Sequence, residues 1–111
     1  VVAVKGLETC IYIYSLSEWE KLASKIADLA FTKKNNREFS RIFLSGAYEA
    51  EIDTKGRINL DTLLIEHAKL NKECVIIGAG NRVEIWDKSI WQDYYNEREQ
   101  QIEEISEDLD L

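Results

Sequence analysis

The chain has 111 residues, of which 45% are hydrophobic, and its 14 lysines and arginines against 21 aspartates and glutamates give a formal net charge of −7 at pH 7. This length allows one modest core. No apolar run reaches the length of a membrane span, and one histidine with two separated cysteines is too few for a zinc set or a disulfide framework. We expect Cys10 and Cys74, both in apolar strand-like runs, to be reduced and buried.

The acidic charge is concentrated at the C-terminal end. Residues 97–111 contain seven acids and one base, Arg98, which gives this segment a net charge of −6. Residues 1–96 are therefore nearly balanced, with 13 bases against 14 acids. The global charge thus leaves room for a local positive surface.

The first predicted unit covers residues 1–30. The β-branched run "VVAV" and the run "TCIYIY" predict two short strands on either side of a turn that begins at Gly6. Ser17, followed three residues later by Glu20, fits a capping box and predicts that a helix begins there.

A linker helix is predicted over residues 31–47. Phe39, Ile42 and Phe43 follow a helical spacing in "FTKKNNREFSRIFLSGA", and Gly46 is a natural stop. The outer face of this helix carries four cations that we regard as auxiliary basic residues, namely Lys33, Lys34, Arg37 and Arg41.

The next stretch alternates like a β-hairpin. Apolar residues alternate with polar ones from Tyr48 to Ile52 and again from Arg57 to Leu60, with Thr54, Lys55 and Gly56 at the turn. Glycine supplies the positive φ that such a turn requires. Asp61 then caps a short predicted helix that includes Leu63, Leu64 and His67.

The residues of this turn suit the binding of an anion. Lysine approaches phosphate as a point charge, and arginine can fork onto phosphate or onto a guanine edge, so Lys55 and Arg57 are candidate contacts. Thr54 shares the tip. Asp53 can accept hydrogen bonds from backbone amides of the turn or orient Arg57, and Gly56 shapes the loop. By itself the motif is explained better by an ordinary solvated turn, and it is the repeated architecture described below that favours a binding role.

Two stretches of the chain are similar at one constant offset. Gly6 and Gly78, Ile13 and Ile85, Ser17 and Ser89, and Trp19 and Trp91 are all 72 positions apart. Ser89 with Gln92 forms a second capping-box pattern. We therefore expect residues 1–22 and 73–94 to follow the same strand–turn–strand–helix path.

The repeat divides the chain into four predicted parts. Residues 1–30 form the end of a first repeat, 31–47 the linker helix, 48–96 a second repeat, and 97–111 an acidic helical tail. The position 72 residues before Asp53 lies upstream of Val1, so we expect the chain to be N-terminally truncated and the first repeat to be incomplete.

Residue types that support catalysis are sparse. The sequence has no glycine-rich phosphate loop and no nucleophile elbow. His67 is expected to be a surface or half-buried packing residue. The aromatic residues are expected to pack in the core and against helices, and they are Tyr12, Tyr14, Trp19, Trp86 and Trp91. We predict no enzyme activity, no cofactor, no metal site and no small-molecule substrate.

Four segments together resemble the MraZ family of bacterial transcriptional regulators. They are "SLSEWEKL", "FLSGAYEAEIDTKGRINL", "KECVIIGAGNRVEIW" and "WQDYY", in this order and spacing. The resemblance implies an α/β fold of short antiparallel hairpins with outer helices, built as an AbrB-type swapped-hairpin barrel of two repeats. It also implies a cytoplasmic, nucleoid-associated repressor that binds repeated promoter boxes on double-stranded DNA before its own division and cell-wall genes.

The family's hairpin motif of an aspartate followed four residues later by an arginine matches Asp53 and Arg57. Lys55 and Arg57 would then contact DNA, and the family's assembly into ring-shaped homo-oligomers would multiply these contacts. Asp61 stands where the family often has proline, and Ile65 replaces a frequent arginine. Two other interpretations remain: an AbrB-like antitoxin whose tail wraps a toxin, and a non-enzymatic assembly module with an ordinary turn.

Overall fold

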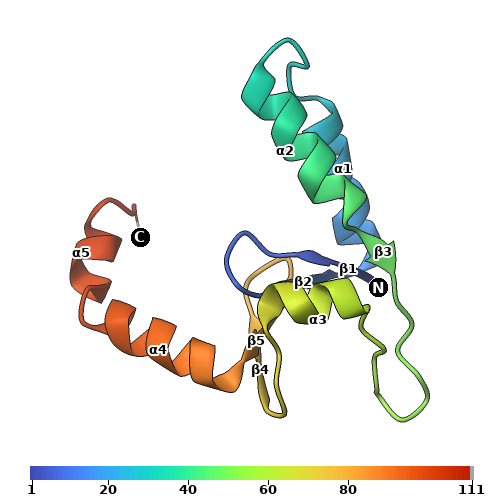
Figure 1. Ribbon diagram of the computed structural model, residues 1–111. Coiled ribbons are helices and arrows are strands. Elements are labelled where there is room, and N and C mark those ends of the chain that lie inside the picture. The colour runs from blue at the N-terminus through green and yellow to red at the C-terminus, as the bar shows by residue number, and fades with distance from the viewer. Residues whose placement is uncertain (111) are drawn as a thin grey trace.

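The structure, a computed structural model, describes residues 1–110 as a small mixed α/β fold (Figure 1). Its strands are β1 (Val2–Lys5), β2 (Ile11–Tyr14), β3 (Tyr48–Glu49), β4 (Cys74–Gly78) and β5 (Val83–Asp87). Its helices are α1 (Leu16–Ala27), α2 (Lys34–Ser45), α3 (Thr62–Ala68), α4 (Lys88–Glu99) and α5 (Ile102–Glu107). In the part of the chain that the structure describes, no helix combines the length and the apolar character needed to cross a bilayer.

The five strands form one antiparallel sheet in the order β3-β1-β2-β5-β4. The two halves of the chain meet where β2 pairs with β5, in a register that places Ile11 opposite Ile85. The predicted α/β class, with short antiparallel hairpins and outer helices, is therefore confirmed. The swapped-hairpin barrel stays a prediction, since β3 and β4 lie at opposite edges of the sheet.

Successive strand residues point to opposite sides of the sheet, so each face carries its own set of apolar side chains. Helices pack against both faces. On one face, Ala3, Ile11 and Ile85 pack against Leu64 and Ala68 of α3. The other face carries a larger cluster that receives α1, α2 and α4, and this cluster contains Val4, Tyr12, Tyr14, Trp86, Ile26 and Phe43. All five predicted core aromatics belong to this cluster or pack against it.

The internal repeat is confirmed at the level of whole elements. Helix α4 begins and ends 72 positions after α1, and β4 and β5 begin 72 positions after β1 and β2. The tryptophans also have equivalent neighbours. Trp19 packs on Tyr14 with ring centroids 5.7 Å apart, and Trp91 packs on the equivalent Trp86 at 5.4 Å.

The two helix caps lie two residues earlier than predicted. Ser15, not Ser17, caps α1 and accepts a hydrogen bond from the Glu18 amide. The equivalent residue in the second repeat is Asp87, not Ser89, and it accepts hydrogen bonds from two amides of α4. Asp61 occupies the cap position of α3 as predicted, but its side chain makes no capping hydrogen bond.

The predicted regular hairpin over residues 48–60 is wrong in extent. Strand β3 holds only two residues, and beyond it a single bridge joins Ile52 to Ile58. The apolar alternation meets the core only at its start, since Tyr48 packs against a core cluster and Ala50 is buried, whereas Ile52 is exposed. The turn at Lys55 and Gly56 is therefore the tip of a long loop that has little sheet structure.

The cysteines differ from each other. Cys10 is buried, and burial raises the pKa of its thiol to about 12. Cys74 is exposed, which corrects the prediction that both are buried. The apolar run "CVII" forms β4, an edge strand with an exposed outer face, and not a strand buried on both sides. Both cysteines are free thiols, as predicted.

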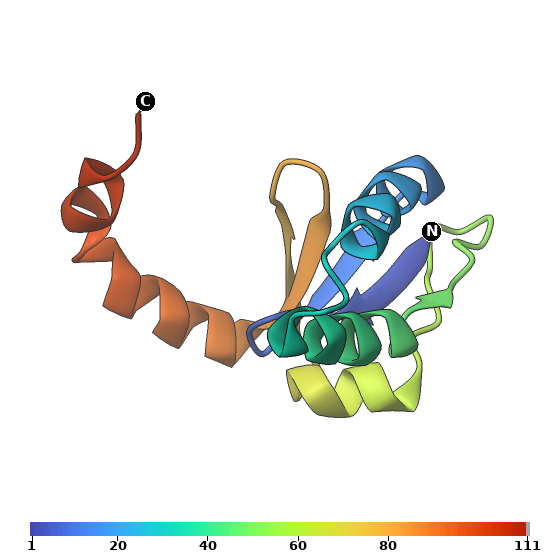
Figure 2. The same cartoon turned by 90° about the horizontal axis from the view of Figure 1, so that it is seen from above.

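The linker helix lies within its predicted range as α2, and Gly46 stands at its C-terminal cap. Only Phe43 of its apolar stripe is buried, since Ile42 and Phe39 remain exposed. Helices α1 and α2 form a helical hairpin that projects from the sheet, whereas α4 and α5 extend from another side of the body (Figures 1 and 2).

Gly6 and Gly78 occupy equivalent positions and give the first testable prediction. A Cβ on Gly6 would lie 2.5 Å from Cys10 Sγ and 2.9 Å from the Cys10 carbonyl, whereas a Cβ on Gly78 would meet nothing within 4 Å. Because overpacking in a core costs about 1–3 kcal/mol, Gly6→Ala is expected to lower the free energy of unfolding by roughly that amount. Urea unfolding measures this, and Gly78→Ala is the matched control with little expected change. Equal losses in the two variants would contradict the repeat's asymmetric packing.

Candidate functional site

The turn over residues 53–57 is built around one carboxylate. Asp53 Oδ1 accepts hydrogen bonds from the backbone amides of Lys55, at 2.9 Å, and Arg57, at 2.8 Å. Backbone bonds close the same turn, from the Asp53 amide to the Arg57 carbonyl and from the Gly56 amide to the Asp53 carbonyl. Gly56 has a φ of +77°, a conformation that side chains disfavour. One carboxylate and one glycine thus set the backbone geometry of this turn.

Asp53 also positions the arginine. Its Oδ2 accepts a hydrogen bond from Arg57 Nε at 3.1 Å, while 72% of the arginine side chain stays exposed. Within residues 1–110, neither terminal nitrogen of Arg57 has a hydrogen-bond partner. The paired edge of the guanidinium is fixed by the turn, and the remaining donors are available to an acceptor outside the chain.

Lys55 and Thr54 lie at the exposed tip, and no carboxylate among the described residues pairs with Lys55. The loop carries Glu49 and Glu51 nearer its base, and both are exposed. The tip of the loop is therefore cationic. It presents Lys55 and the exposed edge of the Arg57 guanidinium, whereas the base of the loop carries carboxylates. Such a tip can contact a phosphate or the edge of a base.

The turn should respond to acid in a defined direction. The hydrogen bond from the Arg57 amide, with further bonds from the Lys55 amide and the Arg57 side chain, outweighs desolvation and lowers the pKa of Asp53. Because the pKa of Asp53 is lowered, the stabilisation that its ionised carboxylate gives to the turn is complete above the ordinary aspartate pKa. This stabilisation is lost as the pH falls through the lowered pKa of Asp53.

An NMR titration checks this expectation. The amide signals of Lys55 and Arg57 should shift with an apparent pKa below that of an unperturbed aspartate, and these shifts should vanish in Asp53→Asn. A midpoint for Asp53 at or above the ordinary aspartate value would contradict the described turn.

The four auxiliary cations lie elsewhere. Lys33 to Arg41 belong to the start and middle of α2, in the part of the helical hairpin that points away from the loop after β3 (Figure 1). Two of them already have partners, because Arg37 Nη1 donates to the carbonyls of Phe31 and Thr32, and Lys34 pairs with Glu38 at 3.7 Å. The structure does not bring these residues together with Lys55 and Arg57.

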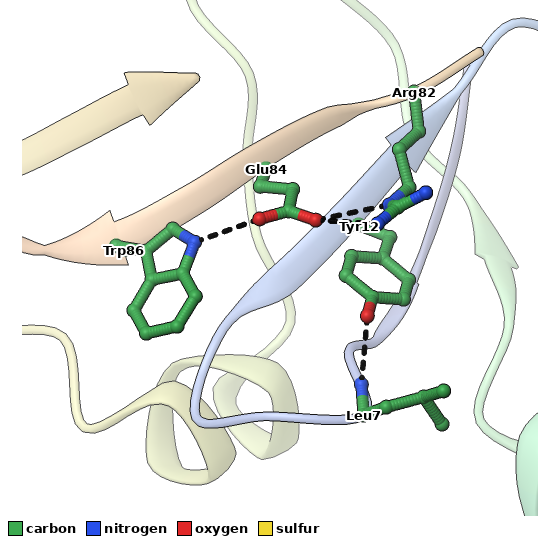
Figure 3. Close-up of polar contacts among 5 residues, drawn as sticks. All are labelled: Leu7, Tyr12, Arg82, Glu84 and Trp86. Carbon is green, nitrogen blue, oxygen red and sulfur yellow. Dashed lines mark hydrogen bonds and ion pairs between the residues drawn. The ribbon is translucent and has the colours of Figure 1, made fainter. Parts of the chain in front are cut away.

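A polar cluster that the sequence reading missed joins the two repeats (Figure 3). Arg82 donates from Nε and Nη2 to Glu84 Oε2 at 3.0 and 2.8 Å, and Trp86 Nε1 donates to Glu84 Oε1 at 3.0 Å. The guanidinium lies 4.4 Å from the ring centroid of Tyr12 on β2, whose Oη accepts a hydrogen bond from the Leu7 amide. The alternation of Arg82, Glu84 and Trp86 along one strand face was the signal available in the sequence.

His67 and the acidic side chains show no catalytic arrangement in the part of the chain that the structure describes. His67 Nε2 lies 3.1 Å from the carbonyls of both Gly6 and Glu8, which ties α3 to the turn after β1. Histidine, cysteine and carboxylate side chains form no metal-holding group across residues 1–110. The loop tip therefore remains the candidate site.

Comparisons with known proteins agree on one family. The family described as "MraZ protein, putative antitoxin-like" matches this chain in two stretches, residues 1–42 and 43–111. Two curated relatives from different strains of Lactobacillus delbrueckii subsp. bulgaricus, both named transcriptional regulator MraZ, are 52% identical to it over 110 residues. Each alignment covers 99% of this chain and 77% of the relative.

Proposed function

The chain belongs to the MraZ family, and from this we propose that it is a sequence-specific DNA-binding transcriptional regulator. In this proposal it acts in the cytoplasm at the nucleoid and represses the division and cell-wall genes next to its own gene. Lys55 and Arg57 contact DNA, Thr54 lies against the same surface, and Asp53 and Gly56 hold the loop in shape.

The observation that carries this proposal is the turn ordered by Asp53. Three hydrogen bonds to one carboxylate fix a loop tip whose two cations remain exposed. An ordered loop loses less conformational entropy when it binds than a mobile one. A turn that served only to connect β3 with α3 would not require an arginine whose Nε is bonded to Asp53 and whose terminal nitrogens face solvent.

One loop provides too few cations for tight binding, because the affinity from phosphate contacts grows with their number. We therefore place several copies of the chain in a ring oligomer whose loops engage repeated promoter boxes. Linking binding events in this way raises the overall affinity well beyond that of one loop. The acidic residues after Glu97 extend from the body on another side than this loop (Figure 1).

A gel-shift experiment tests the proposed function. The chain is titrated against the duplex that precedes its own gene and against a shuffled duplex of equal length and composition. We expect a stable complex with the first duplex at protein concentrations that leave the shuffled duplex free. Equal affinity for the two duplexes would contradict sequence-specific binding.

A further inference from the structure

The base of the loop that carries Lys55 and Arg57 is held together by one hydroxyl group. Tyr48 Oη donates a hydrogen bond to the Asn59 carbonyl at 2.9 Å and accepts one from the Asp61 amide at 2.6 Å. These two bonds join β3, where the loop leaves the sheet, to the residues that lead into α3 (Figure 1). We call this pair of bonds the tyrosine clasp.

The clasp stands where backbone pairing is missing. Within residues 1–110, no backbone hydrogen bond joins residues 48–51 to residues 59–61, and the two limbs of the loop meet in one bridge, between Ile52 and Ile58. A two-stranded ribbon is only marginally stable in water even when it is fully paired, so one bridge does not hold the limbs in a fixed relation. A second attachment is needed to fix the direction of the tip relative to the sheet.

The core anchors both sides of the clasp. The ring of Tyr48 packs against the cluster that includes Leu64 of α3, and Leu60, which lies between the two clasped residues, packs against the same cluster. The apolar packing of Leu60 has no preferred direction. The hydrogen bonds to the Asn59 carbonyl and from the Asp61 amide are directional, so they fix how the backbone runs on either side of Leu60.

We infer that Tyr48 is a positioning residue for DNA binding, which sets the direction in which the loop presents Lys55 and Arg57 to the duplex. Asp53 orders the tip itself, whereas Tyr48 orders the attachment of the loop to the body. A loop that is ordered before it binds loses less conformational entropy in the complex, so the clasp raises the affinity without touching DNA. This inference rests on the proposed function.

Anisotropy titrations of the full chain with the duplex that precedes its own gene test this role. Tyr48→Phe removes the hydroxyl and keeps the ring. Because an ordinary hydrogen bond shifts an equilibrium by roughly two- to tenfold, the affinity for this duplex should fall by about that factor. The slope of log affinity against log salt concentration should not change, since no phosphate contact is lost. Thermal melts should show little destabilisation, because both bonds are exposed and water can replace the hydroxyl.

Tyr12→Phe is the matched control. It also removes a hydroxyl that accepts a hydrogen bond from a backbone amide, that of Leu7 at 3.2 Å, but Tyr12 lies on β2 and not at the loop. Its affinity for DNA should equal that of wild type. Amide hydrogen exchange, read by NMR without DNA, gives an independent measure of the clasp. The Asp61 amide should exchange faster in Tyr48→Phe and at the wild-type rate in Tyr12→Phe.

The outcomes separate this inference from the proposed function. If wild type binds the upstream and the shuffled duplex equally, the proposed function fails and the inference fails with it. If wild type binds specifically and Tyr48→Phe binds as tightly, or if Tyr12→Phe loses as much affinity as Tyr48→Phe, Tyr48 has no positioning role and the proposed function stands. An unchanged exchange rate of the Asp61 amide in Tyr48→Phe would contradict the clasp itself.

Discussion

Arg57→Ala is expected to abolish most of the specific DNA affinity while leaving the fold intact. The side chain lies at an exposed loop tip and makes no core contact, so its removal should change the free energy of unfolding by less than about 0.5 kcal/mol. If Arg57 reads a guanine, each engaged site loses about 1–3 kcal/mol and the sequence preference relaxes. In an oligomer that binds DNA through several loops, the loss of binding free energy is repeated at each engaged loop.

Lys55→Ala separates phosphate contact from base reading. Loss of the lysine charge should weaken binding to the cognate and the shuffled duplex alike. It should also reduce the slope of log affinity against log salt concentration by roughly one per lost phosphate contact. Anisotropy titrations at two salt concentrations, with thermal melts of each variant, measure both effects. Lys72→Ala, which removes one exposed lysine between α3 and β4, is the charge-matched control. If neither Arg57→Ala nor Lys55→Ala changes the affinity for DNA, this turn is an ordinary solvated turn.

Glu84→Ala should be the most destabilising of the charge-removing substitutions. It takes away the acceptor of three hydrogen bonds and leaves Arg82 and the buried Trp86 indole without their partner. Breaking such a pair costs about 3 kcal/mol, here moderated because Arg82 keeps some contact with water. For a chain of this size, the melting temperature should fall by roughly 10 °C.

The control for Glu84→Ala is Glu73→Ala, which removes an exposed ion pair with Lys88 and should leave the melting temperature unchanged. Replacing Arg82 and Glu84 together by leucine should recover much of the lost stability, because no unpaired charge remains. Thermal melts of wild type, the two alanine variants and the double leucine variant measure the melting temperatures, and urea unfolding gives the free energies of unfolding. Equal stability of Glu84→Ala and Glu73→Ala would contradict the described cluster.

The repeat was predictable because it depends on short-range patterns that the sequence displays directly. Glycines, β-branched runs and tryptophans at one offset were enough to place β1, β2 and α1 against β4, β5 and α4. The same patterns placed α2 and α3. The sequence offered two local hydrogen-bonding roles for Asp53, to backbone amides or to Arg57, and the carboxylate makes both sets of bonds within five residues.

Other features depend on partners that a local pattern does not specify. The segment "SLSE" contains two candidate caps, and the helix begins after Ser15 because the strand before it ends at Tyr14. The alternation after Tyr48 predicted a strand, but no neighbouring strand lies beside Ile52 apart from one bridge. Cys74 is exposed because β4 became an edge of the sheet. The packing of Arg82 on Tyr12 requires the β2–β5 pairing.

Protection of lysines from acetylation, read by mass spectrometry with and without the duplex from upstream of the gene, tests the central claim most directly. If the loop tip contacts DNA, the bound duplex should slow the modification of Lys55 several-fold and leave that of Lys21, an exposed lysine on α1, unchanged. Modification of Lys55 at the same rate in the free protein and in the saturated complex would contradict the assignment of this loop as the DNA contact.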